Sequence, residues 1–206
     1  MKPRNPFAEA SFTGSRLPLV AVLVFQSVVA YEWLNSAVTK IVRGGFASGL
    51  ADQLAKNSDG APAWYKSVLD AVIIPNAGIF GYLIEVGELL VGIGLIATAA
   101  VLLVKGQSLS VATLRAVLGV VALSAVGGAF MNLNFSLFGG MPPVWSLGSD
   151  AFSEGISIDG VMMLIQVAMA GFAASLVYSL RERPVVRTVR TVTVAGHRER
   201  AATRAA

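Results

Sequence analysis

Four long apolar segments alternate with shorter polar stretches along the 206-residue chain. They cover residues 17–42, 77–104, 111–135 and 158–180. Each is longer than the roughly 20 residues that a helix needs to cross the hydrocarbon core of a bilayer, and too long for a strand. Only helices and closed barrels satisfy all backbone hydrogen bonds in lipid. The pattern therefore predicts an all-α integral membrane protein, built as a bundle of four transmembrane helices.

The composition agrees with lipid surroundings. Hydrophobic residues make up 55% of the chain and charged residues 14%, whereas soluble domains carry about 25% charged residues. There is no cysteine, and the single histidine, His197, lies in a polar tail. Thiol, iron–sulfur and multi-histidine chemistry is therefore excluded within this chain, and no metal, haem or flavin is indicated. The pI of 9.7 does not indicate a nucleic-acid partner, because the basic residues follow the membrane topology.

The basic residues predict the orientation. Twelve of the 16 lie before the first segment, around the 105–110 connection or after the fourth segment. The positive-inside rule then places both termini in the cytoplasm of a bacterial or archaeal cell. We expect a cytoplasmic N-terminus (1–16), a membrane domain (17–180) and a basic cytoplasmic tail (181–206). A signal-peptidase site at Val28-Val29-Ala30 is the alternative for the first segment, but the apolar run continues to Val42.

The two longer connections are expected to face outward. In the first, residues 52–62 are polar and rich in turn residues, and AWYKSVLDAVIIP follows. Trp64, Val68 and Val72 share one side of that stretch, which ends at Pro75, so we expect a short amphipathic helix in the membrane interface. The second connection, residues 136–157, is rich in Gly and Pro, and we expect it to fold back over the outer end of the bundle.

Two carboxylates, Glu85 and Glu88, stand inside the second apolar segment. At helical spacing they share a stripe with Gly78, Gly81 and Gly92. Small residues allow helices to approach closely. The stripe therefore indicates that both carboxylates face the interior of the bundle.

The other segments bring polar groups to the same outer half, whereas the cytoplasmic halves have almost none. These groups are Glu32, Lys40, Asn132, Asn134, Asp159 and Gln166. An acid near mid-membrane costs about 2.5–3.5 kcal/mol when exposed to lipid. Pairing, protonation or water removes that cost. Two interpretations stay open: a functional cluster, or hydrogen-bonded staples worth about 0.6 kcal/mol each.

Three motifs resemble the DoxX/DoxD family of small four-helix membrane proteins. They are EWLNSAVTK at 32–40, IEVGELLVGIGLI at 84–96 and MNLNFSLFGG at 131–140. The resemblance covers residues 17–180. A serine stands where the family often has glycine in the first helix. The family includes DoxD, the membrane subunit of a thiosulfate:quinone oxidoreductase, so the resemblance implies a quinone, a small reduced sulfur anion, and a partner subunit or homo-oligomer.

The resemblance, taken with the polar positions, gives each candidate residue an expected role. Proton-handling carboxylates are Glu85, Glu88 and Glu32. Anion-binding and orienting groups are Lys40, Arg43, Lys66, Asn132 and Asn134. Groups at the cofactor are Trp33, Gln166 and Asp159. Lys56 is interpreted as a solvated side chain.

Two further function classes remain open. One is a non-catalytic membrane anchor or accessory subunit of a respiratory or redox complex. The other is a small-molecule or proton carrier, although the sequence has no inverted repeat or broken helix of the kind that transporters use.

Overall fold

The computed structural model describes residues 17–140 and 157–180, and every regular element in them is helical. Four long helices match the four apolar segments: α2 (Leu17–Arg43), α5 (Ala77–Lys105), α6 (Val111–Phe138) and α7 (Ile158–Ser179). Each is long and apolar enough to cross a membrane. The prediction of an all-helical fold with four helices able to span a membrane is therefore confirmed.

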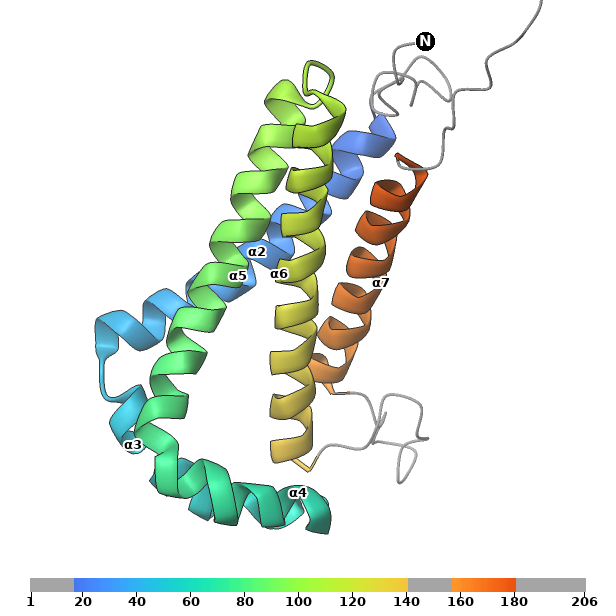
Figure 1. Ribbon diagram of the computed structural model, residues 1–206. Coiled ribbons are helices and arrows are strands. Elements are labelled where there is room, and N and C mark those ends of the chain that lie inside the picture. The colour runs from blue at the N-terminus through green and yellow to red at the C-terminus, as the bar shows by residue number, and fades with distance from the viewer. Residues whose placement is uncertain (1–16, 141–156, 181–206) are drawn as a thin grey trace, which may run out of the picture.

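The long helices pack as two pairs. α2 packs mainly on α5, α6 packs mainly on α7, and contacts between α5 and α6 join the pairs. Figure 1 shows α5, α6 and α7 side by side, with α2 running obliquely behind α6 and α5. The short connection from α5 to α6 lies at one end of the bundle. At the other end α2 finishes and α5 begins, and this end is called the loop-helix end below.

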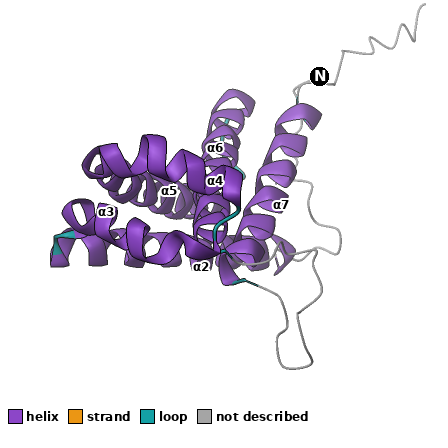
Figure 2. Cartoon of the chain, turned by 90° about the horizontal axis from the view of Figure 1, so that it is seen from below, coloured by secondary structure: helices purple, strands orange, loops and turns teal. Residues whose placement is uncertain are grey.

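The chain between α2 and α5 is almost entirely helical. α3 (Phe46–Asn57) is followed by a 3-10 turn, η1 (Ser58–Gly60), and by α4 (Ala63–Val68). α4 continues through a π-helical turn, η2 (Leu69–Ile73), and a 3-10 turn, η3 (Ile74–Asn76), into α5. Figure 2 shows α3 and α4 lying across the end of the bundle.

α3 was not predicted from the sequence, which suggested turns over residues 52–62. Ala47, Leu50 and Leu54 are buried along one side of α3, at the spacing of an amphipathic helix. Polar residues, Gly44 and Gly45 before α3 and Gly49 within it surround this narrow stripe, so a hydropathy profile does not show it. Residues 63–76 form α4, η2 and η3, and the amphipathic interfacial helix expected in this stretch stays a prediction.

Glycines make the tight junctions at the loop-helix end. Gly44 and Gly45 link α2 to α3 with φ values of 67° and 79°, a left-handed conformation that side chains disfavour. Farther along, a Cβ at Gly81 would overlap the backbone of Ala47. The bare surface of Gly81 therefore lets α3 lie directly on α5.

Three hydrophobic clusters hold the bundle together. The central cluster includes Trp33, Leu95 and Ala173. Leu50, Tyr65 and Leu69 belong to the cluster at the loop-helix end, and Leu102 and Leu114 to the cluster near the α5–α6 connection. Many other large apolar side chains are exposed on the long helices, as expected for surfaces in contact with lipid.

Several expectations concern residues that the structure does not describe. They are the cytoplasmic N-terminus 1–16, most of the second outer connection with its expected fold-back, and the basic tail 181–206. These lie outside the described residues.

Candidate functional site

A buried ion pair joins α2 to α5 in the loop-helix half of the bundle. Lys40 Nζ lies 2.7 Å from both carboxylate oxygens of Glu88. It also donates a hydrogen bond of 2.6 Å to Ser36 Oγ, one turn earlier on α2. The Glu88 side chain is fully buried, and that of Lys40 is 21% exposed. The Glu88 charge is therefore neutralised by a cation that reaches in from the rim of the bundle.

A further acid on α2 interacts electrostatically with acids on two other helices. The Glu32 carboxylate is within electrostatic range of both Glu88, on α5, and Asp159. Asp159 is in the first turn of α7.

Glu85 lies about one turn of α5 away from Glu88, toward the loop-helix end. Like Gly81, Glu88 and Gly92 on the same stripe, it is buried, whereas Gly78 is exposed. Among the described residues Glu85 makes no ion pair and no side-chain hydrogen bond. Both carboxylates thus face the interior, as the stripe predicted, but only Glu88 has a cation.

A second polar contact joins α6 to α7. Asn132 Nδ2 donates a 3.2 Å hydrogen bond to Gln166 Oε1, and both side chains are buried. The Gln166 amide lies against Gly128, where a Cβ would come within 2.7 Å of Oε1. Gly128 therefore provides the space that this amide occupies.

Three buried side-chain donors are left without a partner among the described residues. Arg115 Nε lies near the start of α6, and the other two are the indole Nε1 of Trp33 and the amide Nε2 of Gln166. The Trp33 side chain is 2% exposed and that of Gln166 0%. A buried, unsatisfied donor costs about 1–3 kcal/mol, and native structures contain few of them.

The Trp33 indole and the Gln166 amide border the same hydrophobic cluster. Met162, Ile165 and Met169 pack against the cluster that contains Trp33. Met162 and Met169 lie one turn before and one turn after Gln166 on α7, so the face of α7 that packs against the cluster also carries Gln166.

Asn134 lies apart from Asn132, although the sequence grouped them. Tyr65 Oη donates to Asn134 Oδ1 at 3.0 Å, and Asn134 Nδ2 donates to the carbonyl of Phe130 at 2.7 Å. Residues two positions apart on a helix point in different directions. Asn132 therefore faces α7, whereas Asn134 ties α6 to α4.

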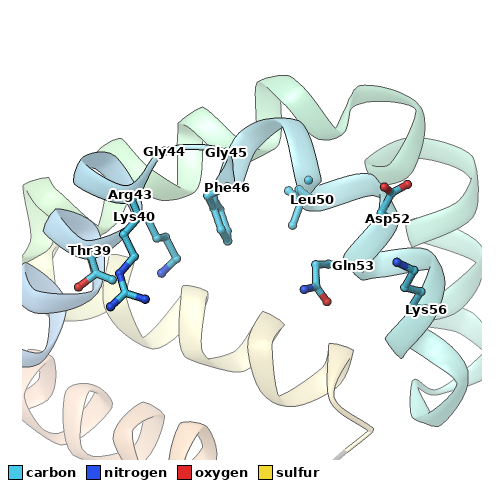
Figure 3. Close-up of a pocket in the computed structure, with 11 residues that line it drawn as sticks. Thr39, Lys40, Arg43, Gly44, Gly45, Phe46, Leu50, Asp52, Gln53 and Lys56 are labelled. Atoms are coloured by element: carbon cyan, nitrogen blue, oxygen red, sulfur yellow. The ribbon is translucent and has the colours of Figure 1, made fainter.

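The expected anion-binding cations are divided between two places. Lys40 and Arg43 line a pocket of about 600 Å³ at the junction of α2 and α3, drawn in Figure 3. Lys56, for which the sequence indicated no role, lines the same pocket from α3. Lys66 does not line it and instead forms an exposed ion pair with Asp59, with an Nζ–Oδ1 distance of 3.0 Å.

A polar contact in the other half of the bundle was missed in the sequence. Gln26 Nε2 donates to the carbonyl of Leu95 at 2.8 Å and to Thr98 Oγ1 at 2.9 Å. Both side chains are buried. The cytoplasmic halves were expected to hold almost no polar groups. Gln26, a glutamine inside the first apolar segment, was the sequence feature that could have predicted this contact.

Comparisons with protein-family models, with curated proteins and with solved structures find no match to this chain. The resemblance to the DoxX/DoxD family therefore rests on the three motifs. In the described residues no three His, Asp or Glu side chains are grouped so that they could hold a metal ion.

Proposed function

We propose that this chain is the membrane subunit of a quinone-linked oxidoreductase, with the quinone between α2 and α7. The observation that carries the proposal is the pair of buried, unpaired donors, Trp33 Nε1 and Gln166 Nε2. A quinone offers two carbonyl oxygens that only accept hydrogen bonds, on a flat apolar ring. The donors and the Met162 and Met169 side chains beside them are chemically matched to such a molecule.

The residues around this region have distinct roles in the proposal. Trp33 and Gln166 bind and orient the ring through its oxygens. A bound quinone supplies the capacity to accept two electrons together with two protons. Lys40 holds the Glu88 carboxylate in an ion pair. Glu85 and Glu32 have no cation partner among the described residues, so they are the carboxylates that hold and pass protons.

The electron donor follows from the resemblance, which implies thiosulfate or a similar reduced sulfur anion at the outer face. Of the expected cations, Lys40 and Arg43 line one pocket, where they would meet such an anion. The described residues offer no redox centre, so electrons would arrive through a partner subunit.

The membrane topology is part of the proposal. The loop-helix end faces outward and both termini lie in the cytoplasm, because 12 of the 16 basic residues precede α2, adjoin the α5–α6 connection or follow α7 in the sequence. α4 then lies in the outer interface, with the exposed ring of Trp64 as its aromatic anchor.

A second function is favoured by a different observation. The Lys40–Glu88 and Asn132–Gln166 contacts each join two helices, as staples do. A non-catalytic anchor or accessory subunit of a redox complex would need such staples and no proton chemistry.

Isolation of the tagged chain in mild detergent, with the subunits that accompany it, allows a direct test. Thiosulfate-dependent reduction of a water-soluble quinone analogue is measured for wild type, Glu85→Gln and Trp33→Phe. Trp64→Phe is the matched control, because Trp64 is exposed. We expect at least a roughly tenfold loss with Glu85→Gln, about 1.4 kcal/mol of barrier. Quinone binding without turnover in wild type would instead indicate the accessory subunit.

A further inference from the structure

The junction of α2 and α3 forms an open basic pocket that the quinone region does not use. Its volume is about 600 Å³, within the range of sites for small molecules. The end of α2 contributes Lys40 and Arg43, and α3 contributes Gln53 and Lys56 from the other side. The left-handed Gly44 and Gly45 line it with bare backbone, because no other heavy atom lies within 4 Å of a Cβ built on either.

The charge of this pocket is positive. Three of its lining residues are basic, and Asp52 is the one acid among them. Lys40 is already paired with Glu88. Arg43 and Lys56 are exposed and have no ion pair or side-chain hydrogen bond within residues 17–140 and 157–180. Two cations are therefore free to bind an anion that enters from outside the protein.

The pocket lies at the C-terminal end of a helix that is long enough to span a membrane. α2 has 27 residues, so it is about 40 Å long, whereas the hydrocarbon core is about 30 Å thick. Val38, Ile41 and Val42, on the neighbouring faces of its last turns, are 48%, 48% and 78% exposed. An apolar surface for acyl chains therefore runs directly alongside the basic pocket.

We infer that this pocket binds the headgroup of an anionic phospholipid, with Arg43 at one end of the pocket and Lys56 at the other as its cationic ligands. Guanidinium groups suit phosphate oxygens. The volume exceeds the need of a small free anion, and the adjoining apolar face suits acyl chains. This inference gives Arg43 a lipid in place of the sulfur anion that the proposed function puts in the same pocket, and the thiosulfate titration below distinguishes the two.

Lipid-dependent thermal unfolding in detergent tests the inference. The delipidated protein is titrated with phosphatidylglycerol or phosphatidylcholine, and separately with inorganic phosphate or thiosulfate. We expect phosphatidylglycerol alone to raise the midpoint. In Arg43→Gln/Lys56→Gln the apparent affinity should fall roughly tenfold or more, because each basic residue near the surface contributes to headgroup attraction. Lys66→Gln is the matched control, since Lys66 lies at the same end but outside the pocket.

Three results would overturn the inference. The first is equal stabilisation by the two lipids, and the second is full phosphatidylglycerol binding by the double variant. The third is stabilisation by free phosphate or thiosulfate equal to that by phosphatidylglycerol, which would identify a site for free anions. If the double variant fails to fold, native mass spectrometry of wild type with an equimolar mixture of both lipids decides. Selective retention of phosphatidylglycerol supports the inference, and equal retention contradicts it.

Discussion

Lys40 Nζ lies within 2.7 Å of both carboxylate oxygens of Glu88, although 48 positions separate the two residues in the chain. The pair lies where α2 and α5 pack together, and its carboxylate is fully buried. Removal of one partner of a buried pair leaves an uncompensated charge, whereas removal of both does not. The stability of the bundle therefore depends on the buried Glu88 carboxylate keeping its cation.

Lys40→Met should destabilise the protein by about 3–5 kcal/mol, because Glu88 loses its cation in a buried position. Lys40→Met/Glu88→Gln should recover most of that loss. Denaturant unfolding in detergent measures both. Lys66→Met is the control for a surface pair and should cost no more than about 1 kcal/mol. A double variant no more stable than the single one would show that the Glu88 charge is not what Lys40 offsets.

Gly81→Ala should destabilise by about 1–3 kcal/mol, because the added methyl would overlap the Ala47 backbone and overpack the α3–α5 contact. Gly78→Ala, one turn earlier on α5, meets nothing within 4 Å and should be neutral or slightly stabilising. The two variants are compared by their unfolding midpoints. Equal midpoints would mean that α3 does not rest on Gly81.

Tyr65→Phe should cost about 1 kcal/mol, because it removes the hydrogen bond to Asn134 Oδ1 and leaves a partly buried acceptor unpaired. Tyr82→Phe on α5 is the control, since the Tyr82 ring is 65% exposed. Protease sensitivity of residues 58–76 gives a local readout. Unchanged sensitivity in Tyr65→Phe would argue against this contact as the tie between α4 and α6.

Gln26→Leu should change stability by less than about 2 kcal/mol, since hydrogen bonds between membrane helices average about 0.6 kcal/mol. The variant frees Thr98 Oγ1, which keeps its own bond of 2.6 Å to the Gly94 carbonyl. Quinone reduction should stay at the wild-type level, because Gln26 lies in the opposite half of the bundle. A loss of activity at unchanged stability would place redox-relevant groups there as well.

The long helices could be predicted because length and hydropathy alone determine them. The inward orientation of Glu85 and Glu88 was also predictable, because glycines at helical spacing mark a packed face. The ion-pair partner of Glu88 was harder to predict. Its contact with Lys40 depends on how α2 and α5 are aligned along each other, with Leu34 against the bare surface of Gly92. The hydrophobic periodicity of a single helix does not reveal how it is aligned against another helix.

Other misses have equally physical causes. Asn132 and Asn134 were grouped as one motif, yet their spacing already implied different directions around α6. α3 was missed because its buried stripe of Ala47, Leu50 and Leu54 is too short to stand out among polar neighbours. The unpaired donors of Trp33 and Gln166 become visible only when both side chains are found buried.

Direct binding of a short-chain quinone is the measurement that tests the central claim. Wild type, Trp33→Phe and the control Trp64→Phe are titrated in detergent, with equilibrium binding as the readout. We predict saturable binding that is about three- to tenfold weaker in Trp33→Phe alone, the value of one lost hydrogen bond. No saturable binding to wild type, or equal affinity in all three proteins, would contradict the assignment of the α2–α7 region to a quinone.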